Sequence, residues 1–181
     1  MGTLRKAASY SKKIVVPFTR ISKKKNKAYI KTVPPQKIVK FTMGNEQLYE
    51  KGRFPFQLTV ISDGDVQIRH NALEACRQYL HKELEKNVNG QYFFRVLCYP
   101  HHIQRENKML TGAGADRMQK GMSLSFGKSM GKAAILKKNS GIFFIALQNR
   151  KKVDLIRHLI RQVKAKMPGK IRILYGEKKR Q

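Results

Sequence analysis

The chain has 181 residues and carries 39 lysines and arginines against 11 aspartates and glutamates, a formal net charge of +28. This length suits one compact domain with tails, and a hydrophobic content of 41% is enough for a core, so the charge does not mark a disordered chain. Because a free protein this basic repels itself, we expect a polyanionic partner, nucleic acid first and an anionic membrane surface second. The sequence contains no run of roughly 18 apolar residues, and its basic start lacks the apolar stretch of a signal peptide, so we expect neither a membrane span nor a secretory signal.

Regular structure is expected from residue 36 onward. The breakers at Pro34 and Pro35 precede a short strand over 37–41, and alternation predicts a second strand over 54–62. A helix follows over about 65–86, although the capping pattern at 71–74 allows a later start. Its apolar stripe consists of Leu73, Cys76, Leu80 and Leu84, widened by Ala72 and Tyr79.

The second half of the chain repeats these two patterns. Further strands are expected over 91–99, 132–136, 141–147 and 170–174, and a second helix over about 150–166. The apolar face of that helix is formed by Val153, Ile156, Leu159, Ile160 and Val163. The predicted fold class is α+β, a sandwich of a largely antiparallel or mixed sheet with two helices, a long functional loop and a basic N-terminal extension.

Basic residues concentrate at both ends of the chain. Residues 1–45 carry 12 basic and no acidic residues, and residues 150–181 carry 12 basic and 2 acidic. One such run is commonly only a solvated face, but two at opposite ends favour nucleic-acid contact. The N-terminal run also contains Tyr10, Phe18 and Tyr29, which either stack on bases or dock onto the protein's own core.

The expected organisation has three parts. Residues 1–35 form a basic extended segment, residues 36–175 an α+β RNA-binding domain, and residues 176–181 a basic tail. The domain includes a loop over 100–131, which is long for a compact domain but punctuated by apolar residues. Small residues and cations within it suit close approach to phosphates, whereas the plainer alternative is a basic surface loop.

Sites for cofactors and catalysis are not predicted. Cys76 and Cys98 belong to no C-x-x-C pair, so we do not expect a disulfide framework or a structural zinc site. We expect an intracellular protein with two buried thiols. A dinucleotide pattern from Gly112 lacks its third glycine, and a phosphate-loop pattern ending at Lys128 has five residues between its glycines where four are needed. We therefore expect no cofactor, no metal and no enzymatic activity.

Three segments resemble one protein family. They are NALEA at 71–75, YPHH at 99–102 and the long run ENKMLTGAGADRMQKGM at 106–122. Shorter matches are VP at 33–34, KIV at 37–39, FTMGN at 41–45 and SFGK at 125–128. Together they resemble the archaeal and eukaryotic branch of the universal large-subunit ribosomal protein family numbered sixteen in bacteria and ten-e elsewhere, over roughly residues 28–175. Two positions depart from that pattern, Ser123 in place of Arg and Ser129 in place of Pro.

The resemblance implies a structural protein of the large ribosomal subunit, cytoplasmic, on the ribosome and closer to archaeal members. Its implied partners are large-subunit rRNA, neighbouring ribosomal proteins and aminoacyl-site tRNA, with no membrane. The family's central loop, here about 109–121, points toward the peptidyl transferase centre. The alternative function is an RNA-processing or RNA-modifying enzyme with a basic RNA platform.

The candidate site residues form two groups. The RNA-binding candidates are Arg20, Lys23, Lys24, Lys25, Lys27, Lys31, Arg69, His70, His101, His102, Arg105, Lys108, Lys120 and Lys128. The candidates of the tRNA-site loop are Thr111, Gly112, Ala113, Gly114, Ala115, Asp116, Arg117, Met118 and Gln119.

Overall fold

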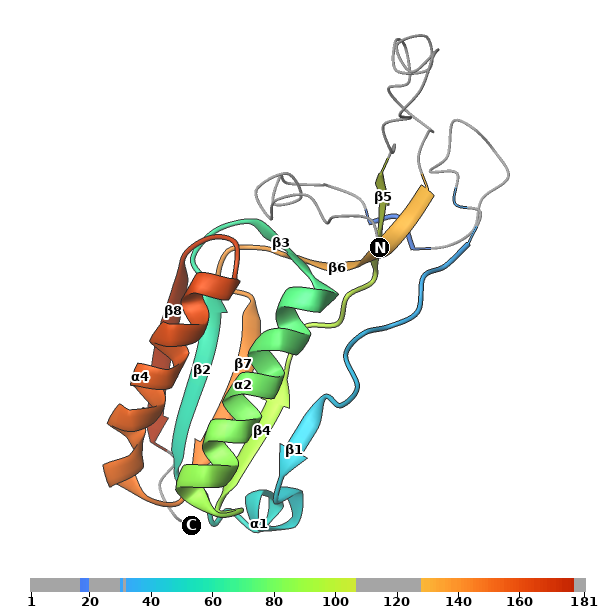
Figure 1. Cartoon of the computed structure of the whole chain (residues 1–181). Coiled ribbons are helices and arrows are strands. Elements are labelled where there is room, and N and C mark those ends of the chain that lie inside the picture. Colours follow the sequence, from blue (N-terminus) through green and yellow to red (C-terminus); the bar gives the residue numbers. More distant parts are fainter. Residues whose placement is uncertain (1–16, 20–29, 31, 107–127, 178–181) are drawn as a thin grey trace, which may run out of the picture.

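The computed structural model describes residues 17–19, 30, 32–106 and 128–177, which form two antiparallel sheets (Figure 1). The large sheet has the strand order β1 (Thr42–Gly44), β4 (Tyr92–Val96), β7 (Gly141–Leu147), β2 (Phe56–Ser62) and β8 (Ile171–Glu177). The small sheet has the order β3 (Val66–Arg69), β6 (Lys128–Leu136) and β5 (His102–Glu106). The α+β class predicted from the sequence is confirmed.

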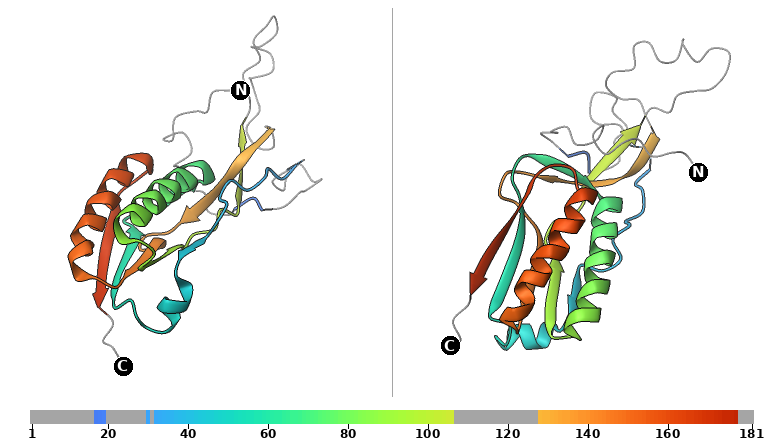
Figure 2. Two further views of the ribbon diagram at one scale, coloured as in Figure 1. Left: turned by 60° about the horizontal axis from the view of Figure 1, so that its bottom comes forward. Right: turned by 60° about the vertical axis from the view of Figure 1, so that its left-hand side comes forward.

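Two helices cover one face of the large sheet, as Figures 1 and 2 show. They are α2 (His70–Val88) and α4 (Val153–Val163), and the 3-10 turns η2 (Arg150–Lys152) and η3 (Lys164–Lys166) extend α4 at its two ends. Each predicted apolar stripe faces the core, since Leu73, Cys76, Leu80 and Leu84 of α2 and Val153, Ile156, Leu159, Ile160 and Val163 of α4 are buried. The helices and the large sheet therefore enclose one continuous core.

A smaller apolar cluster lies at the far end of the large sheet from the small sheet. It comprises Phe54, Phe93 and Ala146, and Leu48 and Tyr49 of the short helix α1 (Glu46–Glu50) pack against it. Asn45 starts α1 by accepting a hydrogen bond from the backbone N–H of Leu48 at 3.0 Å. The sequence prediction did not include α1, because five residues are too few to show a helical period.

Several predicted boundaries shift once tertiary pairing is taken into account. The first strand is Thr42–Gly44 and not 37–41, because its partner β4 ends at Val96, whose N–H donates to the carbonyl of Phe41. The helix predicted from about 65 begins at His70, after β3 has paired with β6. The capping pattern at 71–74 is not used, since the Glu74 carboxylate binds Arg77.

The predicted loop over 100–131 also needs correction. Its first part contains β5 (His102–Glu106) and its last part belongs to β6 (Lys128–Leu136), so both ends of the expected loop are strands. The two strands pair with each other. Alternation of polar and apolar residues over only five positions is too short to predict such a strand from the sequence. At the C-terminus, Gly176 and Glu177 belong to β8 and not to the expected tail.

Candidate nucleic-acid interface

The small sheet brings together predicted RNA-binding residues from distant parts of the sequence. On β6, Ala133 pairs with Arg69 of β3 on one side and with His102 of β5 on the other. Side chains of directly paired residues lie on the same face of a sheet, so Arg69 and His102 lie on the same face, on either side of Ala133. Arg105 follows on β5, opposite Ser129, and carries its charge toward the end of the hairpin.

Both predicted histidines that reach this sheet are buried. His70 is 4% exposed and His102 is 2% exposed, so the chain as described leaves them little surface for a direct RNA contact. Burial lowers the pKa of His70 to about 4, helped by the positive charges of Lys37, Arg69 and Lys132. Burial likewise lowers the pKa of His102 to about 4, with a further contribution from Arg105. Both histidines are thus neutral near pH 7, so they add no positive charge to the sheet.

The small sheet also buries two glutamines and a glycine. Gln104 of β5 donates a 2.6 Å hydrogen bond to the side-chain oxygen of Gln67 of β3, across β6. Gly131 of β6 makes room for the ring of His70, since a Cβ atom at Gly131 would lie 2.9 Å from His70 Nε2. The His70 ring is therefore packed against a glycine.

The N-terminal basic segment is fixed to the edge of the small sheet at Phe18. Its N–H donates to His102 Nδ1 at 3.0 Å, and its carbonyl accepts from the N–H of Ile103 at 2.7 Å. The guanidinium carbon of Arg105 lies 4.7 Å from the centre of the Phe18 ring. Of the two roles left open for the aromatics of this segment, Phe18 takes the docking role, while Tyr10 and Tyr29 lie outside the described residues.

The segment returns to the same sheet further along. Ile30 is 1% exposed, and the hydroxyl of Thr32 lies 3.0 Å from that of Ser129 on β6. Ser129 is one of the two departures from the family pattern, and its side chain is part of this contact; Ser123 lies outside the described residues. Two short stretches of the N-terminal segment thus contact β5 and β6.

His101 points away from its neighbour His102 and is exposed. Its ring lies 4.5 Å from that of Tyr99, which in turn stacks on Phe41 at 5.3 Å. Adjacent residues at a strand end point to opposite sides, so this pair does not chelate one metal ion. Among the described residues, no group of three or more His, Cys, Asp or Glu side chains is arranged to hold a metal.

Most of the other predicted site residues lie outside the part of the chain that the structure describes. For Lys128 the structure gives the backbone position only, paired with Glu106 at the end of the hairpin. The undescribed candidates are Arg20, Lys23, Lys24, Lys25, Lys27, Lys31, Lys108, Lys120 and the whole loop set from Thr111 to Gln119.

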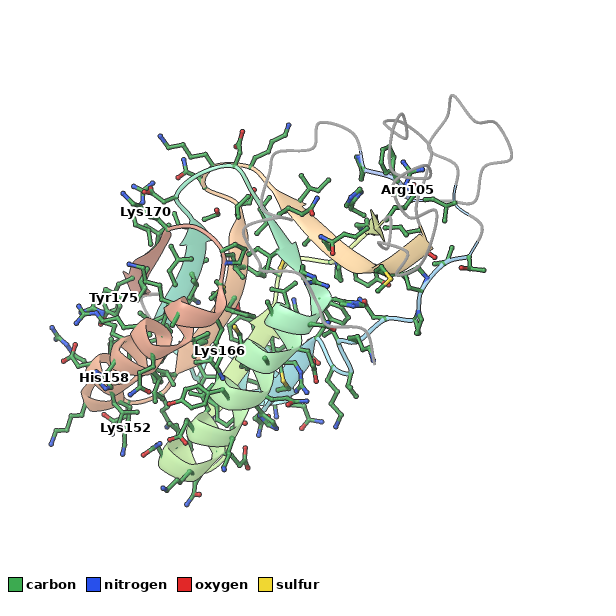
Figure 3. All side chains as sticks on the ribbon, turned by 45° about the horizontal axis from the view of Figure 1, so that its top comes forward. Arg105, Lys152, His158, Lys166, Lys170 and Tyr175 are labelled. Atoms are coloured by element: carbon green, nitrogen blue, oxygen red, sulfur yellow. The ribbon has the colours of Figure 1, made fainter. Side chains whose placement is uncertain are left out.

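Sequence reasoning missed two groups of cations. Lys37 and Lys132 lie close enough to His70 to lower its pKa, yet only the fold brings them there. The second group lies around α4, where Figure 3 labels Lys152 of η2, Lys166 of η3 and Lys170 just before β8, with His158 on α4 itself. The charge count of residues 150–181 was a signal for this second group, but it did not say which residues share a surface.

The two free cysteines are buried, as expected. Burial raises the pKa of the Cys76 and Cys98 thiols to about 12, so both are protonated at neutral pH. No helix in the described residues has the length and apolar character to cross a bilayer.

The fold and its basic surfaces define a strongly cationic α+β protein. A family model described as ribosomal protein L16p/L10e matches residues 17–174. A protein of Hyperthermus butylicus described as large ribosomal subunit protein uL16 is 41% identical over 161 residues, which cover 87% of this chain and 83% of the relative. Two relatives with the same description are each 40% identical to this chain. The match to the protein of Methanospirillum hungatei covers 79% of this chain and 82% of the relative, and the match to the protein of Methanococcus maripaludis covers 82% of this chain and 83% of the relative. The chain belongs to the ribosomal protein L16p/L10e family.

Proposed function

We propose that this chain is a structural, non-enzymatic constituent of the large ribosomal subunit that binds large-subunit rRNA, contacts neighbouring ribosomal proteins and supports the aminoacyl-tRNA site. Its place in the cell is the cytoplasmic ribosome. The family supports the ribosomal role, since the relatives described above all carry the name of a large-subunit protein. The same similarity favours this role over an RNA-processing or RNA-modifying enzyme.

The observation that carries the proposal is the convergence of basic segments on the small sheet. Arg69, Arg105 and Lys132 come from its three strands, and Lys37 approaches His70 beneath it. Phe18 fixes the basic N-terminal segment to the same sheet. Cations that converge in this way neutralise several phosphates at once, which is the main source of affinity for RNA.

The second support concerns the segment 107–127, which contains the proposed tRNA-site loop. Its two ends are held together, because Glu106 of β5 pairs with Lys128 of β6. The loop thus starts and finishes at the sheet on which the basic segments converge. This arrangement suits a loop that reaches from an rRNA-anchored base toward a tRNA, with Arg117 as its main cation because a guanidinium both pairs with phosphate and stacks on a base.

The three-part organisation remains part of the proposal. Residues 1–35 act as an RNA-binding extension. Residues 36–177 act as the folded rRNA-binding domain with its loop, since Gly176 and Glu177 belong to β8, and residues 178–181 act as a short basic tail. The first two parts are joined physically at Phe18 and Thr32.

Neutralising the extension tests the proposal without removing the Phe18 anchor. We would replace Arg20, Lys23, Lys24, Lys25 and Lys27 by Gln and measure binding to deproteinised large-subunit rRNA as a function of salt. Each lost phosphate contact should lower the slope of log K against log salt by about 0.7–0.9. The matched control replaces the exposed lysines Lys51, Lys82 and Lys86, which lie away from the small sheet. Equal slopes for both variants, or a full chain that fails to enter large subunits, would contradict the proposal.

A further inference from the structure

A second cationic surface lies away from the small sheet, on α4 and β8. Residues 150–177 contain nine lysines and arginines against two acidic residues. Figure 3 shows Lys152, His158, Lys166, Lys170 and Tyr175 along this side, with Arg105 across the molecule. We call the exposed side chains of residues 150–177 on η2, α4, η3, β8 and the turn that joins η3 to β8 the α4–β8 face.

The register of α4 turns its polar residues outward. Val153, Ile156, Ile160 and Val163 are buried, which leaves His158, Arg161 and Gln162 on the exposed side. With a rise of 1.5 Å per residue, the cations from η2 to η3 extend over about 20 Å. That length matches several consecutive phosphates of one extended RNA strand.

Acidic side chains neutralise little of this face. Asp154 lies 3.4 Å from Arg157, and Asp63 lies 2.9 Å from Arg172. Within the described part of the chain, Lys152, Arg161, Lys164 and Lys170 form no ion pair with an acidic residue. Most of the positive charge of the face is therefore free to bind an external anion.

Part of the face is already ordered by hydrogen bonds. The Tyr79 hydroxyl of α2 donates to the side-chain oxygen of Gln162 at 2.5 Å, and the Gln162 nitrogen lies 3.1 Å from His158 Nε2. Lys166 Nζ lies 5.1 Å from the centre of the Tyr79 ring. Because these long side chains are held before any partner arrives, less conformational entropy is lost when a partner binds.

Tyr175 gives the face an exposed aromatic ring. It lies on β8, the edge strand of the large sheet, opposite Leu58 of β2, and is 40% exposed. The guanidinium carbon of Arg157 lies 5.4 Å from the centre of its ring. An aromatic ring held by a cation at an open edge, among free lysines, is the arrangement on which bases of single-stranded RNA stack.

We infer that the α4–β8 face is a second RNA-binding surface, on which an unpaired base of single-stranded RNA stacks on Tyr175 while Arg161, Lys164 and Lys170 bind the neighbouring phosphates. The inference rests on the proposed function for the identity of the partner, but it concerns a different surface and different residues. The exposed ring beside Arg157 favours RNA over an acidic protein or an anionic membrane, for which the lysines alone would suffice.

The test uses the full chain and a single-stranded 12-nucleotide RNA that contains 4-thiouridine, cross-linked by light and mapped to peptides. We expect a cross-link in the peptide that contains residues 171–177, at least fivefold weaker in Y175A and retained in Y175F. Cross-links to the N-terminal segment should be equal in all three proteins and serve as an internal reference. Circular dichroism of each variant checks that the fold is intact.

Three outcomes would overturn the inference. The first is an equal cross-link at 171–177 in Y175A, and the second is no cross-link there in the wild-type chain. The third is loss of this cross-link on adding polyglutamate or anionic phospholipid vesicles at a charge concentration at which the N-terminal cross-links persist. A wild-type chain that cross-links through its N-terminal segment but not through residues 171–177 refutes this inference alone. A chain that does not bind RNA at all refutes the proposed function.

Discussion

The ring nitrogen Nδ1 of His102 accepts a hydrogen bond from the backbone N–H of Phe18, 84 residues earlier in the chain. This contact joins the basic N-terminal segment to the hairpin that carries the 107–127 segment. It requires a neutral imidazole, because a protonated ring nitrogen is a donor and no longer accepts. The low pKa of His102 keeps this contact intact at neutral pH.

Acidification is expected to destabilise the protein through its two buried histidines. In the folded state each has a pKa of about 4, against an ordinary value of 6.5. The unfolded chain binds protons at a higher pH than the folded protein does. The free energy of unfolding is therefore unaffected above pH 6.5, and between pH 6.5 and pH 4 each histidine lowers it by about 1.4 kcal/mol per pH unit. Urea unfolding at pH 7.5, 6, 5 and 4 measures this. His102→Asn retains an acceptor without titrating, so a pH profile as steep as that of the wild type would contradict the assignment.

Replacing Phe18 by Ala should release the N-terminal segment without unfolding the core. The ring contacts with His102 and Arg105 would be lost, and an aromatic–cation contact contributes about 0.5–2 kcal/mol. The amide of Ile103, which donates to the Phe18 carbonyl, should then exchange hydrogen faster, whereas amides of β7 should not. Phe18→Tyr keeps an aromatic ring and is the control. Unchanged exchange at Ile103 in the Ala variant would show that the backbone alone holds the segment.

A methyl group at Gly131 should disturb the small sheet. The added Cβ would meet His70 Nε2 at 2.9 Å, and overpacking of this kind costs about 1–3 kcal/mol. Gly176→Ala on β8 is the matched control, because nothing lies within 4 Å of its Cβ position. The comparison is made by urea denaturation. Equal stabilities would mean that the His70 ring moves aside freely.

The buried pair Glu74–Arg77 should be sensitive to loss of one charge. Both carboxylate oxygens of Glu74 are bound by Arg77, at 2.6 and 2.7 Å, and Arg77 also donates to the sulfur of Met43. Glu74→Gln leaves the guanidinium buried without its counter-charge, at a cost on the order of 3 kcal/mol. The double variant with Arg77→Met should recover most of that loss. A double variant no more stable than Glu74→Gln would show that the pair itself, and not the unpaired charge, determines stability.

Deletion of residues 111–119 should separate assembly from translation. The small sheet and the basic segments that anchor the chain remain, so the variant should enter large subunits at normal occupancy. Those subunits should synthesise peptide more slowly, because the proposed support of the aminoacyl-tRNA site is missing. Arg117→Ala should give a weaker form of the same defect. Normal occupancy together with a wild-type rate of synthesis would refute the role of the loop.

The sequence predicted the elements with strong periods and missed those that depend on pairing. The bounds of β7 and the apolar faces of α2 and α4 agree with prediction, because a regular spacing of apolar residues over many positions fits only one type of secondary structure. By contrast, β3 and β5 have four and five residues, and only their partner β6 makes them strands.

The same limit applies to the candidate site. Arg69 and His102 were chosen from the sequence, but their adjacency follows from pairing with Ala133. The burial of His70 and His102 and the approach of Lys37 and Lys132 are properties of packing, with no local signal. Charge counting located basic regions but not the surfaces onto which they fold.

The order of the large sheet has a consequence for how the chain folds during synthesis. β2 (Phe56–Ser62) is flanked by β7 and by β8, and β8 (Ile171–Glu177) is synthesised after every other strand among the described residues. Until β8 emerges, one edge of β2 has unpaired backbone groups beside apolar side chains, which is a template for aggregation. Pairing over such a separation is also slow, because a long chain closure precedes it. The nascent protein is therefore at risk until residues 171–177 have emerged, and a truncation before residue 171 would leave that risk permanent.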